Sequence, residues 1–236
     1  MSSSTPLSPA DLAFFEEHGW CVARSVISRA QAARTAAEIW KFDGRDPDDA
    51  STWSAAPLRE RMVHGVEQWN NRTAPGVHGA FAQLFGTPRL WCTHDVVGIK
   101  LPLPPDDEAH IRARETGRYA DGLHWDTPNF YTYINTIHED YPAYQPEPGA
   151  RNAAEGIGPI PFQVQGVLYL VDVPEDNGAF YCVDGFHKRV DPWLRTLAPD
   201  TDPKQEDLLG LGAVRVAGNA GGASLSPGPY SPLTDG

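Results

Sequence analysis

The first third of the chain carries apolar residues at helical spacing, bounded by helix-capping signals. Ser8 and Asp11 form a capping box and Gly19 supplies a C-terminal stop, so a first helix is predicted between them. After Ser28, alanines and a tryptophan fall on one helical face, which predicts a second helix through about Phe42. Two further segments can be helical, residues 58–69 and 77–85.

From position 90 onward the pattern changes to the period of two that is typical of strands. Residues 90–100 alternate, and residues 162–173 form a second strong strand. Asn177–Gly178 is a tight-turn dipeptide, which predicts that residues 179–186 are the hairpin partner of the second strand. Shorter strands are expected at 119–126 and 213–217, and short helical turns at 191–197 and 204–209.

Two stretches lack sustained periodicity. Residues 128–161 contain six prolines and several aromatic residues, which predicts a long loop or lid. Residues 219–236 have a low-complexity, turn-forming composition and are expected to be a disordered tail. The remaining residues, 1–218, are expected to form a single domain, helical over 8–86 and built of strands over 90–218.

This order of elements predicts the fold class. Helices followed by strands favour an α+β chain, mainly β, whose strands close into a sandwich or a barrel instead of a parallel sheet. With 22 glycines and 22 prolines, the composition suits a β-rich domain with many turns. There is no glycine-rich loop of the kind that binds phosphates.

Composition and charge limit the kinds of partner that the protein is expected to bind. The net charge of −12 repels phosphate backbones, so we expect no nucleic acid partner. No run approaches the roughly 18 uncharged apolar residues of a membrane span, and the first residues do not resemble a signal peptide. The three cysteines do not match a disulfide framework or a zinc site. We therefore expect a cytoplasmic protein that does not bind membranes; its oligomeric state is left open.

One short motif points to metal chemistry. His124 and Asp126 stand two residues apart, so in a strand both side chains project to the same face. Together with one more histidine they would form the two-histidine, one-carboxylate set that holds iron(II) and leaves positions open for substrate or oxygen. The same spacing also arises in a partly exposed strand with a hydrogen-bonded histidine.

Three segments in order resemble the phytanoyl-CoA dioxygenase family: residues 8–24, residues 123–127 with the His-x-Asp pair, and residues 164–189. The resemblance implies a double-stranded β-helix, that is, a jelly-roll, cupin-like barrel. It also implies bound iron(II), with 2-oxoglutarate as cosubstrate and molecular oxygen as oxidant. The substrate would be a small organic molecule, hydroxylated or otherwise oxidised, whose identity the sequence does not give.

The same resemblance assigns roles to individual residues. His124 and Asp126 would be the first two iron ligands. Lys100 stands where the family often places a residue near 2-oxoglutarate, although it could also end a solvated strand. Gln165, on a strand that would line the barrel interior, could bind 2-oxoglutarate or substrate, or could face solvent.

The chain departs from the family pattern near its end. The family's third iron ligand, a histidine after a Gly-Asp pair, and the arginine that binds 2-oxoglutarate have no counterpart after Arg215. Gly222 stands in place of the aspartate, and the last strands of the barrel are expected to be missing. A one-base frameshift near Gly222 is one explanation. His187 lies in a Gly-x-His that resembles a structural turn in the family, yet it could fill the third position.

Three hypotheses follow. The leading one is an iron(II)/2-oxoglutarate-dependent dioxygenase. The second is an inactive family member that at most binds a ligand, and the third is a cupin-like metal enzyme that uses His187 without 2-oxoglutarate. Five further histidines have no carboxylate or cysteine at ligand spacing and are expected in surface or capping roles: His18, His64, His78, His110 and His138.

Overall fold

The computed structural model combines helices with antiparallel strands, as the α+β prediction requires. The helices are α1 (Pro9–His18), α2 (Arg29–Asp43), α3 (Val66–Arg72), α4 (Pro75–Phe85) and α8 (Val190–Leu194). Single 3-10 turns are Ala50–Thr52, Phe186–Lys188 (η3) and Leu209–Leu211. The strands are β1 (Cys21–Ala23), β2 (Leu58–Arg61), β3 (Val97–Ile99), β4 (Val164–Leu168), β5 (Phe180–Val183), β6 (Ala213–Val216) and β7 (Ala223–Pro227). The structure describes residues 5–53, 58–61, 64–90, 92, 96–99, 164–175, 178–198, 206 and 208–227.

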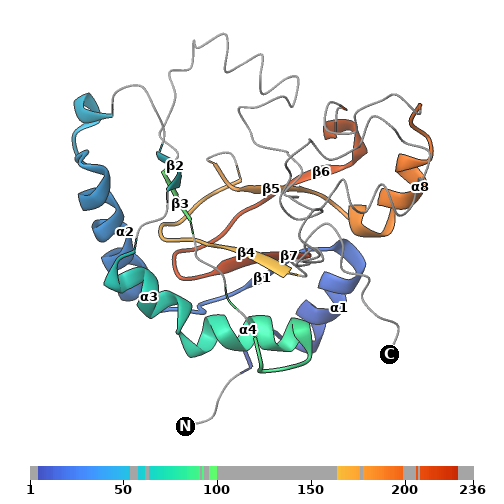
Figure 1. The fold of residues 1–236 in the computed structure, drawn as a ribbon, viewed down its shortest axis with the longest axis horizontal. Coiled ribbons are helices and arrows are strands. Elements are labelled where there is room, and N and C mark those ends of the chain that lie inside the picture. The colour runs from blue at the N-terminus through green and yellow to red at the C-terminus, as the bar shows by residue number, and fades with distance from the viewer. Residues whose placement is uncertain are drawn as a thin grey trace, which may run out of the picture.

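The strands form three antiparallel sheets. The first has the order β1-β7-β4, and the other two are the pairs β2-β3 and β5-β6. In Figure 1, helices α1 and α4 lie on one side of the β1-β7-β4 sheet, and the β5-β6 pair lies on the other. The first sheet therefore has one face toward helices and one face toward a second sheet.

The same two stretches of chain supply strands to both of these sheets. Strand β4 pairs with β7, and β5 pairs with β6. Between these pairs the contact continues: Tyr169 N donates to Gly222 O at 2.9 Å, and Val173 N donates to Gly218 O at 2.8 Å. Residues 164–183 thus run antiparallel to residues 213–227. The predicted hairpin between residues 162–173 and 179–186 is wrong, because β7 and β6 occupy those pairing positions.

The C-terminal segment corrects a second prediction. Residues 219–227 are not a disordered tail: they form a turn and then β7, the central strand of its sheet. Leu225 is fully buried and Ser224 is 1% exposed. The Leu225 side chain can be buried here because Gly166 of β4 has no side chain, and Leu225 fills the space that this leaves. At least this C-terminal strand, expected to be missing, is present.

The turn that leads into β7 is fixed from two sides. The Asp172 carboxylate accepts a hydrogen bond from Ala220 N at 2.8 Å and binds both terminal nitrogens of Arg29. Gly221 has a φ of 87° and accepts a hydrogen bond from Ile27 N. A Cβ at Gly221 would collide with the Ile27 carbonyl oxygen. Only glycine combines a positive φ with the absence of a Cβ, so only glycine fits at position 221.

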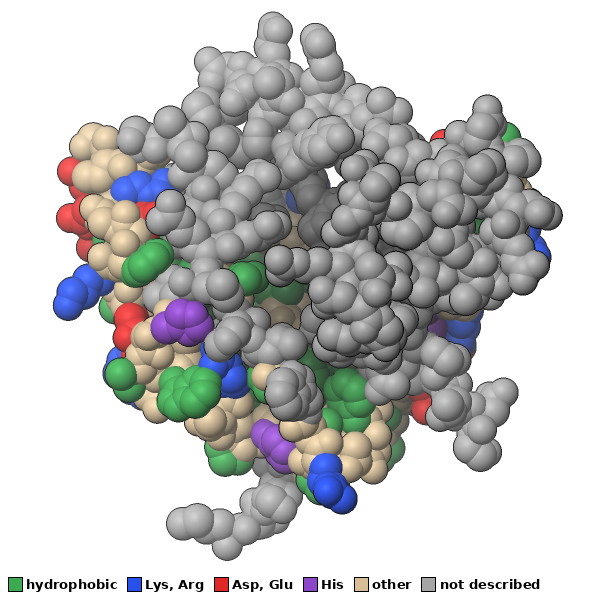
Figure 2. Space-filling view, in the orientation of Figure 1, with side chains coloured by type: hydrophobic (Ala, Val, Ile, Leu, Met, Phe, Trp, Pro, Cys, Tyr) green, Lys and Arg blue, Asp and Glu red, His purple; other side chains and the backbone are tan. Residues whose placement is uncertain are grey.

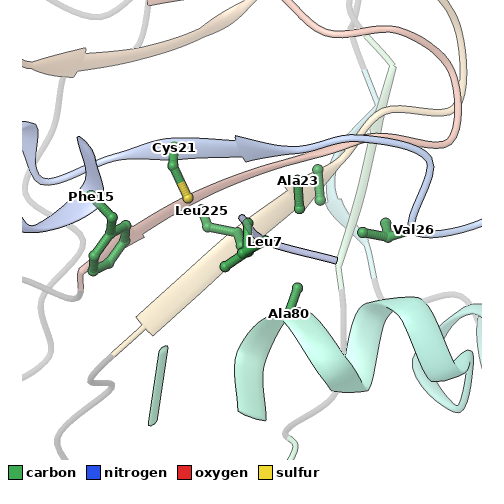
Figure 3. Packing of buried hydrophobic residues seen from close by; sticks show 8 residues of the cluster. Leu7, Phe15, Cys21, Ala23, Val26, Ala80 and Leu225 are labelled. Atoms are coloured by element: carbon green, nitrogen blue, oxygen red, sulfur yellow. The ribbon is translucent and has the colours of Figure 1, made fainter. Parts of the chain in front are cut away.

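The helix-facing side of the β1-β7-β4 sheet carries the main core (Figure 3). Strands β1 and β7 contribute apolar side chains that alternate along the chain, and α1, α4 and the N-terminal segment cover them. The buried cluster consists of Leu7, Phe15, Cys21, Ala23, Val26, Ala80, Ala223 and Leu225. Burial raises the pKa of the Cys21 thiol to about 12, so this cysteine stays protonated.

The predicted caps of the first two helices are confirmed. Ser8 and Asp11 form the capping box of α1, and Gly19 ends the helix with a φ of 71°. Ser28 accepts a hydrogen bond from Gln31 N at the start of α2, and Gly44 ends that helix in the left-handed region.

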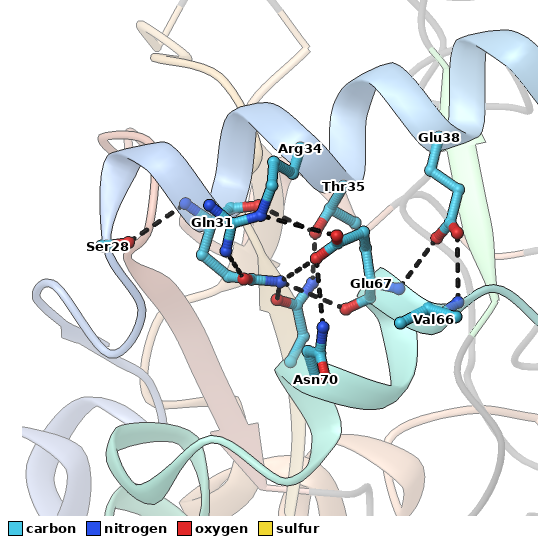
Figure 4. A network of polar contacts seen from close by, with 9 residues as sticks. Ser28, Gln31, Arg34, Thr35, Glu38, Val66, Glu67 and Asn70 are labelled. Atoms are coloured by element: carbon cyan, nitrogen blue, oxygen red, sulfur yellow. Dashed lines mark hydrogen bonds and ion pairs between the residues drawn. The ribbon is translucent and has the colours of Figure 1, made fainter.

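The third predicted helix is wrong in its first part. Residues 58–61 form β2, and α3 begins only at Val66. The reason lies in α2, whose Glu38 carboxylate accepts hydrogen bonds from Val66 N and Glu67 N (Figure 4). A carboxylate from a neighbouring helix thus caps the free N–H groups of the first turn. Farther along the same interface, Gln31 donates to Glu67 Oε2 at 2.8 Å.

The strands predicted over 90–100 and 162–173 are shorter than expected. Within the described residues, these stretches contain β3 and β4. The described strands also form no closed barrel, since the three sheets share no strand. The jelly-roll therefore stays an expectation, while the sandwich-like arrangement of antiparallel sheets is observed.

The outer surface of the helices is mixed in character. Figure 2 shows acidic, basic and apolar side chains interspersed on this face, with no large patch of one charge sign among the described residues. Val66 and Trp69 are the most exposed large apolar residues of α3, and the Arg72 guanidinium lies 4.7 Å from the Trp69 ring. Of the helices described here, none is both long and apolar enough to cross a membrane.

The buried position of β7 predicts a stability effect. Leu225→Ala should lower the free energy of unfolding by about 2–5 kcal/mol, because it leaves a cavity between β7 and α4. Urea denaturation followed by circular dichroism measures the loss. Val171→Ala, at a position that is 57% exposed, serves as control and should stay within about 0.5 kcal/mol of the parent chain. Equal effects of the two substitutions would contradict a buried β7.

Candidate functional site

The face of the β1-β7-β4 sheet that points away from the helices carries polar side chains among valines; we call it the inner face. Residues directly opposite in an antiparallel pair share a face. Gln165 of β4 lies opposite Ser226 of β7, and Ser224 lies between Val22 and Val167. A glutamine and two serines therefore line a surface that an ordinary sandwich core would fill with apolar side chains.

The serines of the inner face are deeply buried. Ser224 is 1% exposed and Ser226 is 7% exposed. Ser224 Oγ has no hydrogen-bond partner in regular geometry within the described part of the chain, although the Tyr169 hydroxyl is close enough to interact with it. Leaving a buried hydroxyl without a partner costs about 1–3 kcal/mol, so an interior of this kind suits a polar ligand or bound water.

Tyr169 connects the inner face to the second sheet. Its hydroxyl donates to Val216 O on β6 at 2.6 Å. Burial raises the pKa of this phenol, while the nearby Ser224 side chain acts in the opposite direction. The Tyr169 ring packs over Gly218, where a Cβ would collide with it. This tyrosine thus holds the two sheets together at one end of the inner face.

Solvent reaches the inner face along β4. Val167, on the same face as Gln165, is 44% exposed, and Gln165 itself is half-buried. The available groups are an amide and hydroxyls, which are neutral near pH 7. They can orient a polar molecule by hydrogen bonds, but they do not supply a charged acid or base.

Of the four predicted site residues, the structure describes one. Gln165 lies on the inner face opposite Ser226, and its role in binding 2-oxoglutarate or substrate stays a prediction. Lys100, His124 and Asp126 lie outside the described residues, so their roles stay predictions. Lys100 follows directly after β3, which ends at Ile99. No group of three histidine, cysteine, aspartate or glutamate side chains within the described ranges could hold a metal ion.

His187 is held in a structural turn, as the family resemblance implies. Its Nε2 lies 3.0 Å from Glu16 O, and a carbonyl oxygen only accepts, so this nitrogen donates. Its Nδ1 is buried against Gly19. Burial is the main cause that lowers the pKa of His187. Both ring nitrogens therefore face α1 or its end, and the alternative that His187 completes a metal site loses its support.

Sequence reasoning missed Ser224 and Ser226 because the segment was expected to be disordered. The signal was nevertheless present. Ala223, Ser224, Leu225 and Ser226 alternate between apolar and polar side chains, which is the period of a strand with two different faces.

Comparison with known proteins gives partial matches. No family model matches the chain. A 104-residue stretch is 36% identical to "Ava biosynthesis cluster protein O" of Aspergillus versicolor, covering 38% of this chain and 33% of that protein. The fold resembles that of the hypothetical protein JW0805 from Escherichia coli, with a TM-score of 0.55, 14% identity, and coverage of 94% of this chain and 62% of the other.

A second solved structure, from Salmonella typhimurium LT2 and described as a candidate oxidoreductase, has 17% identity and a TM-score of 0.49. The match covers 94% of this chain and 64% of the Salmonella chain, and its TM-score is too low to indicate a shared fold. The chain therefore spans about a third of the Aspergillus protein and less than two thirds of each bacterial protein.

The state of His187 predicts a pH dependence. Because its pKa is held below the ordinary value of 6.5, the unfolded chain takes up a proton that the folded chain resists as the pH falls below that value. The parent chain should lose stability from about pH 7.5 to 5.5 faster than His187→Gln, by at most about 1.4 kcal/mol per pH unit. Gln can still donate to Glu16 O, so the fold is kept. Urea denaturation across this range checks it, and parallel pH curves would rule the effect out.

Proposed function

We propose that this chain is an iron(II)- and 2-oxoglutarate-dependent oxygenase that oxidises a small organic molecule. The observation that carries the proposal is the group of polar side chains on the inner face, where Gln165 and Ser226 lie opposite one another beside the buried Ser224. Hydrogen-bonding groups between two sheets match a site for a polar cosubstrate. The likeness to a protein named for a biosynthesis cluster supports a small-molecule substrate.

The metal would be held by His124 and Asp126. Imidazole and carboxylate are donor types that suit non-haem iron(II), and their spacing places both on one face of a strand. Iron(II), when bound, supplies the chemistry that activates oxygen. His187 is not available as a third ligand, because its ring is already hydrogen-bonded to the backbone of α1.

The remaining residues would bind and orient the cosubstrate. Lys100 carries a positive charge that complements a carboxylate of 2-oxoglutarate. The Gln165 amide can both donate and accept hydrogen bonds, and the Ser226 hydroxyl opposite it can do the same. Since none of the inner-face groups titrates near neutral pH, their part is orientation and not proton transfer.

A second candidate function is a ligand-binding protein of the same fold without turnover. The contact between His187 and Glu16 favours it, because a histidine held by the backbone of α1 is not available to a metal ion. The cupin-like alternative depended on His187 and is weakened by the same contact.

An anaerobic titration with iron(II) and then 2-oxoglutarate separates these functions. The parent chain should develop the visible absorption band of the chelated complex. His124→Ala should weaken iron binding by more than about 100-fold, since losing an outer-shell partner alone already costs about 10–100-fold. His187→Gln should bind iron as the parent chain does, and His78→Gln is a matched control because His78 contacts the Pro88 carbonyl at the surface.

Each other outcome has a definite reading. If folded parent chain binds neither iron nor 2-oxoglutarate, the oxygenase proposal is wrong and the ligand-binding candidate remains. If His187→Gln abolishes iron binding while the chain stays folded, the cupin-like alternative is restored. Equal binding by His124→Ala and the parent chain would exclude His124 as a ligand.

A further inference from the structure

An open hollow of about 680 Å³ lies where the end of α1 meets η3 and the start of β6. Glu17 and His18 of α1 line it on one side. Asp184 and Arg189, which flank η3, and Gly212, which precedes β6, line the rest. It shares no described residue with the inner face.

A histidine–carboxylate pair forms one wall of the hollow. His18 Nδ1 lies 3.0 and 3.1 Å from the two oxygens of Asp184, and Trp20 Nε1 donates to Asp184 at 2.8 Å. Burial opposes ionisation of Asp184, but the hydrogen bonds from Trp20 and His18 outweigh it, so its pKa lies below the ordinary value. An ionised carboxylate only accepts, so Nδ1 carries the hydrogen and Nε2 is left for another partner.

The charges around the hollow are not all matched. Lys188 forms an ion pair with Glu17 at 2.6 Å, and Asp184 is held by His18 and Trp20. Arg189 has no carboxylate within ion-pair distance in the described part of the chain. Its Nη2 instead donates to two backbone carbonyls, Asp184 O at 2.6 Å and Leu211 O at 2.8 Å.

The two carbonyl contacts fix the guanidinium in one orientation. Its other donors, Nη1 and Nε, make no hydrogen bond within the described residues. An arginine held in this way presents a planar set of N–H groups that match the oxygens of a carboxylate or phosphate. His18 Nε2 can supply a further hydrogen bond from the same hollow.

We propose that this hollow binds a small oxyanion, the carboxylate or phosphate group of a metabolite, between Arg189 and His18. Arg189 already attracts the Asp184 carboxylate at longer range, and the anion adds a hydrogen-bonded negative partner for its other donors. In a chain with a net charge of −12, an arginine without a carboxylate partner is a specific place for an anion to bind.

The experiment is a titration of the full chain with inorganic phosphate and, separately, with acetate, followed by amide NMR shifts of Gly185 and Gly212, which line the hollow. Saturable shifts are expected with at least one anion, and comparing the two arms tells phosphate from carboxylate. Arg189→Gln should weaken binding about tenfold or more, as expected for loss of a charged hydrogen bond. Arg195→Gln, an exposed arginine just beyond α8, removes the same charge and should bind as the parent chain does.

Arg189→Gln also removes contacts with two carbonyls, so Arg189→Lys is the second variant. It keeps the charge without the planar set of donors, and its affinity should fall between those of the parent chain and Arg189→Gln. The absence of saturable shifts in the parent chain would overturn the proposal. If the parent chain and both Arg189 variants bind the anion with equal affinity, the binding is that of an adventitious ion only and the proposal is overturned. The same holds if Arg195→Gln loses as much affinity as Arg189→Gln.

Discussion

The antiparallel pairing of residues 164–183 with residues 213–227 is the contact on which the rest of the described structure depends. It creates β4-β7 at one end and β5-β6 at the other, so one continuous pairing builds parts of two sheets. Strand β1 adds to the free side of β7, and helices α1 and α4 then cover the face that this sheet offers. The inner face and the hollow both lie along this pairing.

Local structure was predictable where a short segment contains its own signal. The capping box of α1 and the glycine that ends it depend on neighbours within one turn, and they were found. The partners of strands were not predictable. Asn177–Gly178 reads as a hairpin turn, but the register is set by residues about 45 positions away at Gly218 and Gly222, which no local pattern contains. The start of α3 likewise depends on Glu38 of another helix.

The candidate site could likewise be predicted only in part from the sequence. Strand alternation alone left open whether Gln165 faces the interior or solvent, because period two separates the two faces of a strand without saying which one is covered. Ser224 and Ser226 were not predicted, because the composition around them is typical of disordered segments, although residues 223–226 alternate between apolar and polar side chains as a strand does. The pairing of His18 with Asp184 cannot be predicted from local sequence, because the carboxylate lies 166 positions later in the chain.

The pairing of Cys21 with Leu225 has a consequence for biosynthesis. A ribosome releases the N-terminal helices and β1 long before β7 leaves the exit tunnel. Until then the apolar sides of α1 and α4 have no sheet to cover, and loop closure spans almost the whole chain. The nascent protein must therefore remain soluble with its main core unformed, and its folding is completed only after synthesis has passed β7.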